Sequence, residues 1–244
     1  MRLTWDDTGK RFYETGVKQG VLYPQVDGAY PKGVAWNGLT AVTESPSGAE
    51  ATPLYADDIK YLELRSNEEF GCTIEAYTYP DEFKPCNGEA TLVKGVTLGQ
   101  QTRTPFGFCY KTITGDGDSF NGKYDYILHF AYNATVSPSE KTHDTINDSP
   151  DAATFSWEAT TDPVTAGTVT IGGSTVQLLP EGKKRTSLVT LNVGAYIEAA
   201  ADALARTTRE NNIATLLDFI EGTNSTDSKM PTPWQIHNII STGL

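Results

Sequence analysis

Cysteine is scarce in this sequence of 244 residues, and long apolar runs are missing from it. The three cysteines, Cys72, Cys86 and Cys109, are widely spaced and form no C-x-x-C pair, so they predict neither a disulfide framework nor a zinc site. Cys72 and Cys109 fall within strand patterns, which favours buried thiols. No apolar stretch is long enough to cross a bilayer, so we expect no stable membrane association. Because no charged-then-apolar leader begins the sequence, we expect folding in a reducing cytoplasm.

Positive charge is also in short supply. The chain has 19 Lys and Arg against 31 Asp and Glu, a formal net charge of −12. Nucleic-acid binding needs clustered Lys and Arg that neutralise phosphates. The one dense basic run, residues 183–185 (Lys-Lys-Arg), is interpreted as a hairpin turn. Net charge bears on partners rather than on fold, and this balance predicts a chain that repels DNA.

Motifs that carry catalysis or hold cofactors are missing as well. There is no Walker loop, no G-x-G-x-x-G run and no G-x-S-x-G elbow. The turn at Asp116 and Asp118 is the best metal candidate. An EF-hand loop begun at Asp116 fails, because Phe120 and Ile127 stand where oxygen ligands are needed. A solvated turn is the better interpretation.

Histidines and paired carboxylates do not form a recognisable site either. His129 lies on the polar face of an expected strand and His143 in a long loop, and neither has metal-ligand spacing to another histidine. Adjacent carboxylates at residues 57–58 and 81–82 are expected by chance among 31 acids. We therefore assign no catalytic residue, no cofactor and no metal ligand, and predict that the chain is not an enzyme.

Aromatic residues, glycine and proline are plentiful, which is typical of strands joined by turns. Residues 124, 126, 128, 130 and 132 are Tyr, Tyr, Leu, Phe and Tyr, so one face of a strand carries all five. Phe155, Trp157 and Ala159 share a face in the same way. The connection between them, residues 137–153, is too long for a tight hairpin. It is either a flexible surface loop or an arm that reaches another subunit.

Alternation predicts further strands at residues 18–23, 36–44, 59–64, 71–79, 106–113, 168–171, 175–179 and 188–193. Residues 45–58 read as a long polar loop, so residues 36–64 resemble a hairpin with an extended tip. Residues 59–64 are apolar on both faces, and we expect this strand inside a sheet or between layers. The Gly172-Gly173 pair predicts a hairpin between its two neighbouring strands.

The repeat changes to helical spacing after residue 193. Ile197, Ala200, Ala201 and Leu204 would share one helical face. A second helix is expected from Asn211 or Asn212, as its N-cap, to Gly222, with Ile213, Leu216, Leu217 and Ile220 on its apolar face. Residues 223–244 read as a loop with an apolar end that docks. We expect one domain over residues 1–244, with core strands at about 18–193 and a helical, arm-like part at about 194–244.

Amphipathic strands, long polar connections and no catalytic motif together favour an assembly protein, because sheet edges and arms can pair with other copies. Alternatives are a carbohydrate-binding β-sandwich module of a virion or secreted protein, in which exposed aromatics stack on sugars, and a glycoside hydrolase with facing carboxylates.

Five runs of the sequence resemble the major tail proteins of long-tailed bacteriophages and related prophages of Gram-positive bacteria. These runs are residues 33–40, 45–61, 75–83, 95–101 and 147–157. The resemblance covers roughly residues 1–180, and the C-terminal third departs from it. It implies a mainly β fold, the phage tail-tube β-sandwich or barrel with long loops and flanking C-terminal helices.

The resemblance also implies a structural, non-enzymatic function. Such subunits form hexameric rings that stack into a tail tube, the conduit for genome delivery, within a virion assembled in the host bacterial cytoplasm. Implied partners are further copies of the chain, tape-measure protein, and tail-terminator or baseplate proteins, while DNA passes through without specific binding. We hypothesise that Glu75, Asp125 and Glu158, on the polar faces of three strands, line the lumen. The loops at residues 44–58 and 137–153 are expected to contact other subunits.

Overall fold

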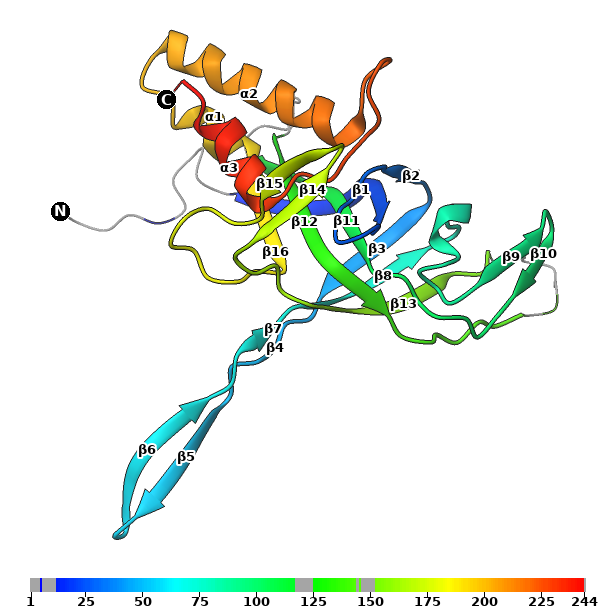
Figure 1. Cartoon of the computed structure of the whole chain (residues 1–244). Coiled ribbons are helices and arrows are strands. Elements are labelled where there is room, and N and C mark those ends of the chain that lie inside the picture. Colours follow the sequence, from blue (N-terminus) through cyan, green and yellow to red (C-terminus); the bar gives the residue numbers. More distant parts are fainter. Residues whose placement is uncertain (1–4, 6–11, 117–124, 144, 146–151, 244) are drawn as a thin grey trace.

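The computed structural model describes residue 5 and residues 12–116, 125–143, 145 and 152–243. Within these residues the chain is mainly β, as expected, and contains a large antiparallel sheet. Three α-helices gather on one side of the strands, and a narrow two-stranded arm projects from the other side (Figure 1). No helix in the described part of the chain has the length and apolar character needed to span a bilayer.

The elements follow one another along the chain in this order. The strands are β1 (Phe12–Pro24), β2 (Val34–Trp36), β3 (Leu39–Glu44), β4 (Ser47–Gly48), β5 (Ala51–Ala56), β6 (Ile59–Arg65), β7 (Glu68–Glu69), β8 (Gly71–Ala76), β9 (Ala90–Val93), β10 (Val96–Leu98), β11 (Phe106–Asp116), β12 (Asp125–Val136), β13 (Phe155–Thr161), β14 (Thr168–Ile171), β15 (Ser174–Gln177) and β16 (Leu188–Asn192). The helices are the short 3₁₀ helix η1 (Asp81–Phe83) and the α-helices α1 (Val193–Glu198), α2 (Ala203–Glu221) and α3 (Pro233–Ser241).

The main sheet has the order β2-β1-β11-β12-β13-β8-β3, and β16 also pairs with β12. β12 is the central strand, because one of its edges pairs with β11 while the other pairs first with β16 and then with β13. A left-handed backbone at Asn133, with φ of 49°, lies close to this change of partner. The sheet curls so far that β3 returns to β1, and a Cβ on Gly20 would collide with the Leu39 side chain.

The curled sheet encloses an inner core of large side chains. Trp157 and Trp36 lie at its centre, with ring centroids 5.6 Å apart, and Phe83 of η1 closes it from the side. Phe106, Phe108 and Tyr110 all face this core, as their alternation predicts. The inward face of β13 is also confirmed, because Trp157 and Ala159 are buried and Phe155 packs against the core.

A second core lies on the other face of β1, β11, β12 and β16. There the helices, together with Leu178 and Leu179 after β15, cover Leu128, Phe130 and Tyr132, the aromatic face that β12 was expected to present. Tyr126 packs at its margin, while residue 124 lies outside the described residues. The helical part therefore shares its apolar interior with the sheet. The C-terminal apolar end docks as expected, with Ile236 buried in this core.

The helix boundaries differ from those expected. α1 ends at Glu198, and α2 begins after Asp202, whose Oδ1 accepts a hydrogen bond from the Ala205 N–H at 2.8 Å. The expected N-caps Asn211 and Asn212 lie inside α2, so that prediction is wrong, although Gly222 does end the helix. Leu204 is 78% exposed, because the chain turns between the two helices and no single apolar face continues through them.

Three further expectations are corrected. Residues 36–44 are two strands, because the chain turns at Asn37 and Gly38, where Gly38 has φ of 80°. Residues 223–244 are not all loop, since a capping box at Thr232 begins α3. The basic run at residues 183–185 is not a hairpin turn but part of the loop from β15 to β16, which pair with different strands. The Gly172-Gly173 hairpin is confirmed by β14 and β15.

Candidate assembly surface

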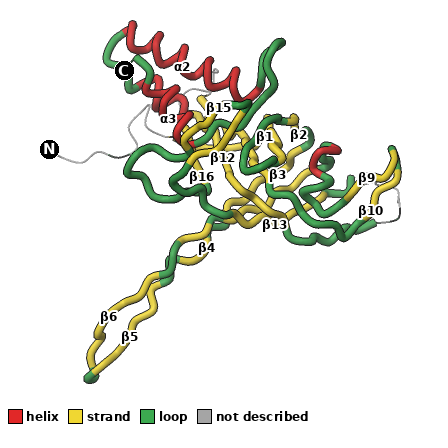
Figure 2. The backbone as a smooth tube through the Cα atoms, in the orientation of Figure 1, coloured by secondary structure: helices red, strands yellow, loops and turns green. Residues whose placement is uncertain are grey.

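The feature that most needs a partner is the arm, residues 47–69, which carries β4, β5, β6 and β7 (Figure 2). β4 pairs with β7, and β5 pairs with β6, but neither pair joins the main sheet. The expectation of a long loop at residues 45–58 is wrong, because most of it forms paired strands. The expected hairpin with an extended tip is present, although the strands that it joins are β3 and β8.

The tip of the arm is a tight turn at Asp57 and Asp58. Both residues have left-handed backbones, with φ of 52° and 62°. Two successive positive φ values are what a type I′ hairpin turn needs, and Asp tolerates this region better than most residues. Asp57 and Asp58, an adjacent pair that the sequence explained by chance, therefore form the turn at the end of the ribbon.

The register of the ribbon separates its side chains onto two faces. Directly opposed residues of an antiparallel pair point to the same side. Leu54 pairs with Leu62, Thr52 with Leu64, and Ala56 with Ile59, and these six residues form what we call the apolar face of the arm. The other face carries Pro53, Tyr55, Lys60, Glu63 and Arg65, and Glu63 forms ion pairs with both Lys60 and Arg65.

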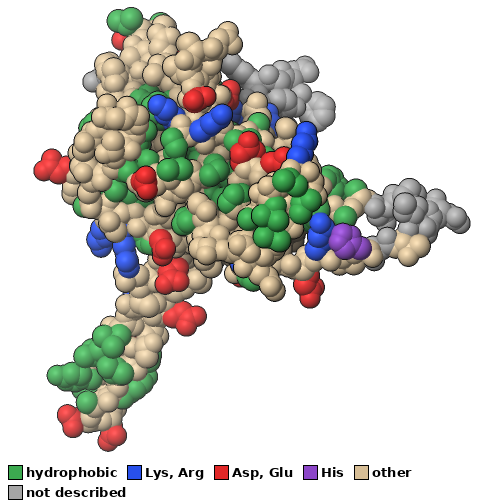
Figure 3. All heavy atoms as spheres, turned by 45° about the vertical axis from the view of Figure 1, so that its right-hand side comes forward, with side chains coloured by type: hydrophobic (Ala, Val, Ile, Leu, Met, Phe, Trp, Pro, Cys, Tyr) green, Lys and Arg blue, Asp and Glu red, His purple; other side chains and the backbone are tan. Residues whose placement is uncertain are grey.

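The apolar face is open to solvent. Ile59 is 64% exposed, Leu64 56% and Leu54 43%. The expectation that residues 59–64 lie inside a sheet or between layers is wrong for the single chain, because no other element of the described structure covers them. An isolated two-stranded ribbon is marginally stable in water, and contiguous exposed apolar surface usually marks an interaction site. Figure 3 shows hydrophobic side chains grouped along the arm.

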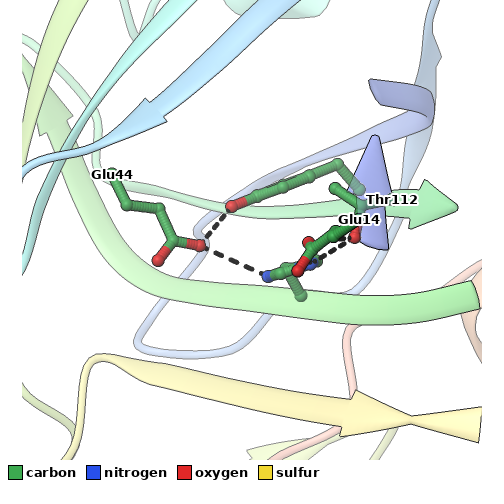
Figure 4. Close-up of polar contacts among 5 residues, drawn as sticks. Glu14, Glu44 and Thr112 are labelled. Atoms are coloured by element: carbon green, nitrogen blue, oxygen red, sulfur yellow. Dashed lines mark hydrogen bonds and ion pairs between the residues drawn. The ribbon is translucent and has the colours of Figure 1, made fainter. Parts of the chain in front are cut away.

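The arm leaves the body just after Glu44, which is held in a polar cluster at the end of β3. The Tyr110 hydroxyl donates a hydrogen bond to Glu44 Oε1 at 2.6 Å, and the Tyr110 ring stacks on the His129 imidazole with centroids 4.5 Å apart. In Figure 4, Glu44 approaches the cluster from one side and Glu14 and Thr112 from the other. The cluster thus links β3 to β1, β11 and β12.

His129 is the buried centre of this cluster. From the sequence, His129 was expected only to lie on the polar face of a strand. The Thr112 hydroxyl donates to Glu14 Oε1 at 2.6 Å, so His129 Nε2, which is 2.9 Å from Thr112 Oγ1, is the donor to that oxygen. Nδ1 then faces Glu44 Oε1 at 3.3 Å. Burial lowers the pKa of His129, while the carboxylates of Glu44 and Glu14 oppose that shift. No sequence pattern near His129 signals this cluster, because Glu14 and Glu44 come from strands far earlier in the chain.

The remaining candidates for chemistry do not converge. His143 and His237 are exposed and distant in sequence from the cluster, and Asp118 lies outside the described residues. The described residues contain no group of three His, Cys, Asp or Glu side chains arranged to hold a metal ion. All three cysteines are free and buried, as expected for Cys72 and Cys109.

The three acids proposed for a lumen do not share one surface. Glu75 lies opposite Ser156, and Glu158 lies opposite Thr73, so Glu75 and Glu158 are on the same outward face of β8 and β13. Asp125 begins β12 and, by alternation, lies on the side of Ala131, a residue of the inner core. Asp125 is also beside Gly194 at the start of α1. The described part of the chain therefore groups two of the three acids.

Part of the other expected contact loop, residues 137–153, lies outside the described residues, at positions 144 and 146–151. Its described residues include exposed positions 138–143.

No known family matches this chain, and no curated protein matches it. The features that bear on function are therefore the arm, the sheet face that carries Glu75 and Glu158, and the five sequence runs.

Proposed function

We propose that this chain is a structural tail-tube subunit of a long-tailed bacteriophage or related prophage. It self-assembles into stacked hexameric rings that form the conduit for genome delivery. The observation that carries this proposal is the arm, whose open apolar face needs a partner that the chain does not itself supply. The sequence run at residues 45–61, which resembles major tail proteins, makes up most of that arm.

A second copy of the chain is the natural partner for the arm. The arm and the surface that receives it are different parts of one molecule, so each copy donates an arm to one neighbour and receives an arm from another. Such head-to-tail contacts produce rings when the rotation closes and open stacks when it does not. A tube made of rings needs one contact of each kind, and the arm supplies one of them.

The charge of the chain also supports a conduit. A bore that conducts DNA must not hold it, and phosphate binding depends on clustered cations. The net charge of −12 and the outward face with Glu75 and Glu158 suit a wall that repels phosphates. We propose this face, which also carries Ser156 and Thr73, as the lumen lining.

Electron microscopy of the purified chain in negative stain tests the proposal. We expect rings or tubes for the wild type. The double variant Leu62→Gln/Leu64→Gln makes the apolar face polar and is expected to abolish them. The matched control Lys60→Gln/Arg65→Gln places the same residue type on the opposite face of the same strand and is expected to assemble. Monodisperse wild-type monomers at high concentration would reject the proposal, and sugar binding by those monomers would favour the carbohydrate-binding alternative.

An arm-less variant separates assembly from folding. The Ser45 N–H donates to the Gly71 carbonyl at 2.8 Å, so the ends of the arm are adjacent and a short glycine-rich turn can replace residues 47–69. The inner core contains no residue from the arm. We therefore expect a folded monomer with an unfolding transition close to that of the wild type. Tubes formed by this variant would show that the arm is not the assembly element.

A further inference from the structure

A cleft lies at the root of the arm, next to the loop between β15 and β16. Its volume is about 430 Å³, and both polar and apolar side chains line it. The lining includes Asn67 and Glu68 of the arm and Lys184 and Arg185 of the loop. We call this the root cleft. Its wall is built from the arm root on one side and from residues 184–188 on the other.

The lining of the root cleft includes part of the one dense basic run of an acidic chain. Lys184 and Arg185 line it, Lys183 is adjacent, and all three are exposed. Among the described residues, none of these three cations forms an ion pair. Glu68 is the single acid in the lining, so the cations outnumber it. The one dense basic run of the sequence therefore borders a concave site, and its cations form no ion pair within the described part of the chain.

The arm tip has the opposite charge. Asp57 and Asp58 are exposed at the turn, and neither pairs with a cation among the described residues, since Lys60 and Arg65 are both engaged by Glu63. In Figure 3, acidic side chains stand at the end of the arm, and both basic and acidic side chains stand beside its root. One molecule thus carries complementary groups at the two ends of one projecting element.

The length of the arm separates these two groups. Strands rise about 3.3 Å per residue, so the ten residues from position 47 to the tip extend about 30 Å. A tip cannot return to its own root because the ribbon is paired along its length. A second copy that stands beside the first and is shifted by about one arm length along the arm brings its root cleft to the first copy's tip.

We propose that Asp57 and Asp58 of one copy dock in the root cleft of a second copy, against Lys184 and Arg185. This rests on the proposed function and identifies the surface that receives the arm. The body extends from the root away from the arm (Figure 1), so an arm whose tip sits at a neighbour's root runs along that neighbour's body. In this placement the apolar face is the side of the arm that is turned toward that body. Each copy gives one tip and receives one, which extends the stack in one direction.

Charge reversal with rescue tests the contact. Asp57→Lys/Asp58→Lys and Lys184→Glu/Arg185→Glu are made separately and combined. Assembly is measured by sedimentation across a concentration series at low and moderate salt. We expect each reversal to raise the concentration needed for assembly about tenfold or more, because like charges then oppose each other at the interface. The combined variant restores the pairing and should assemble within about threefold of the wild type.

Glu198→Lys/Asp218→Lys is the matched control, because it changes the net charge by the same amount as the tip reversal but on exposed positions of α1 and α2. It is expected to assemble like the wild type. Wild-type assembly that neither reversal weakens, or two reversals that the combined variant fails to rescue, would overturn the docking site while leaving the tube proposal intact. Failure of the wild type itself to assemble would instead reject the proposed function.

Discussion

His129 makes folding stability depend on pH, and burial of its ring sets the direction of that dependence. Burial lowers the pKa of His129 below its ordinary value of 6.5. The pKa is 6.5 in the unfolded chain and lower in the folded chain. Between these two values the unfolded chain binds more protons, so stability rises with pH. The stability is therefore lost as pH falls below 6.5 toward the pKa of the folded chain. The ionisable groups that face the ring are Glu14 from β1, Glu44 from β3 and Tyr110 from β11.

The size of the effect has an upper bound. If His129 stays neutral in the folded protein down to pH 5, the loss relative to neutral pH is about 2 kcal/mol, since one proton contributes about 1.4 kcal/mol per pH unit. Stabilities of such domains are about 5–15 kcal/mol, so the loss is a sizeable fraction. With an m-value of about 2 kcal/mol/M, the urea midpoint should fall by no more than about 1 M.

Urea unfolding followed by tryptophan fluorescence measures this loss, using the arm-less variant to keep the chain monomeric. His129→Gln retains a polar side chain that can contact Thr112 and Glu44 but does not titrate, and its midpoint should change much less between pH 7 and pH 5. His143→Gln, at an exposed histidine, should keep the wild-type dependence. If the arm-less chain with His129 intact keeps or raises its urea midpoint on acidification, the reasoning is refuted, because attraction to Glu14 and Glu44 then outweighs burial.

Three other predictions concern stability and reactivity. Trp157→Ala should destabilise the chain by about 3–5 kcal/mol in urea unfolding, because the side chain is 1% exposed at the centre of the inner core; a loss below about 1 kcal/mol would contradict that. Asp202→Ala should cost about 1 kcal/mol by removing the N-cap of α2, whereas Asn211→Ala should stay within about 0.5 kcal/mol; equal losses would argue against the observed helix start. Burial raises the pKa of all three cysteines to about 12, so a thiol reagent at pH 8 should label the unfolded chain and leave the native one largely unlabelled.

The strands of the main sheet were the most predictable part of the fold. In β13 a buried apolar face alternates with a more exposed polar face, and in β11 and β12 large aromatic side chains recur at every second position. Tyr126, Leu128 and Phe130 therefore had to share a face, whatever covered them. The Gly172-Gly173 hairpin was equally local, because its turn chemistry lies within two residues.

The arm was harder to predict, because its sequence resembles that of a buried strand. Leu62 and Leu64 lie on one face and Ile59 joins them only because a register shift follows Leu54. From the sequence alone these residues suggested burial within the chain. The structure leaves them open, and burial by another copy of the chain is our proposal for the same apolar signal.

The sequence by itself determined which residues alternate, where turns interrupt them and which side chains avoid water, since these depend on neighbours a few positions apart. Tertiary structure alone decided where His129 and Glu44 meet, that Leu204 is exposed, and that residues 184–185 border the root of the arm. Those outcomes depend on how the sheet curls and which distant strands become adjacent. Contacts of that kind leave no periodic trace in a linear sequence.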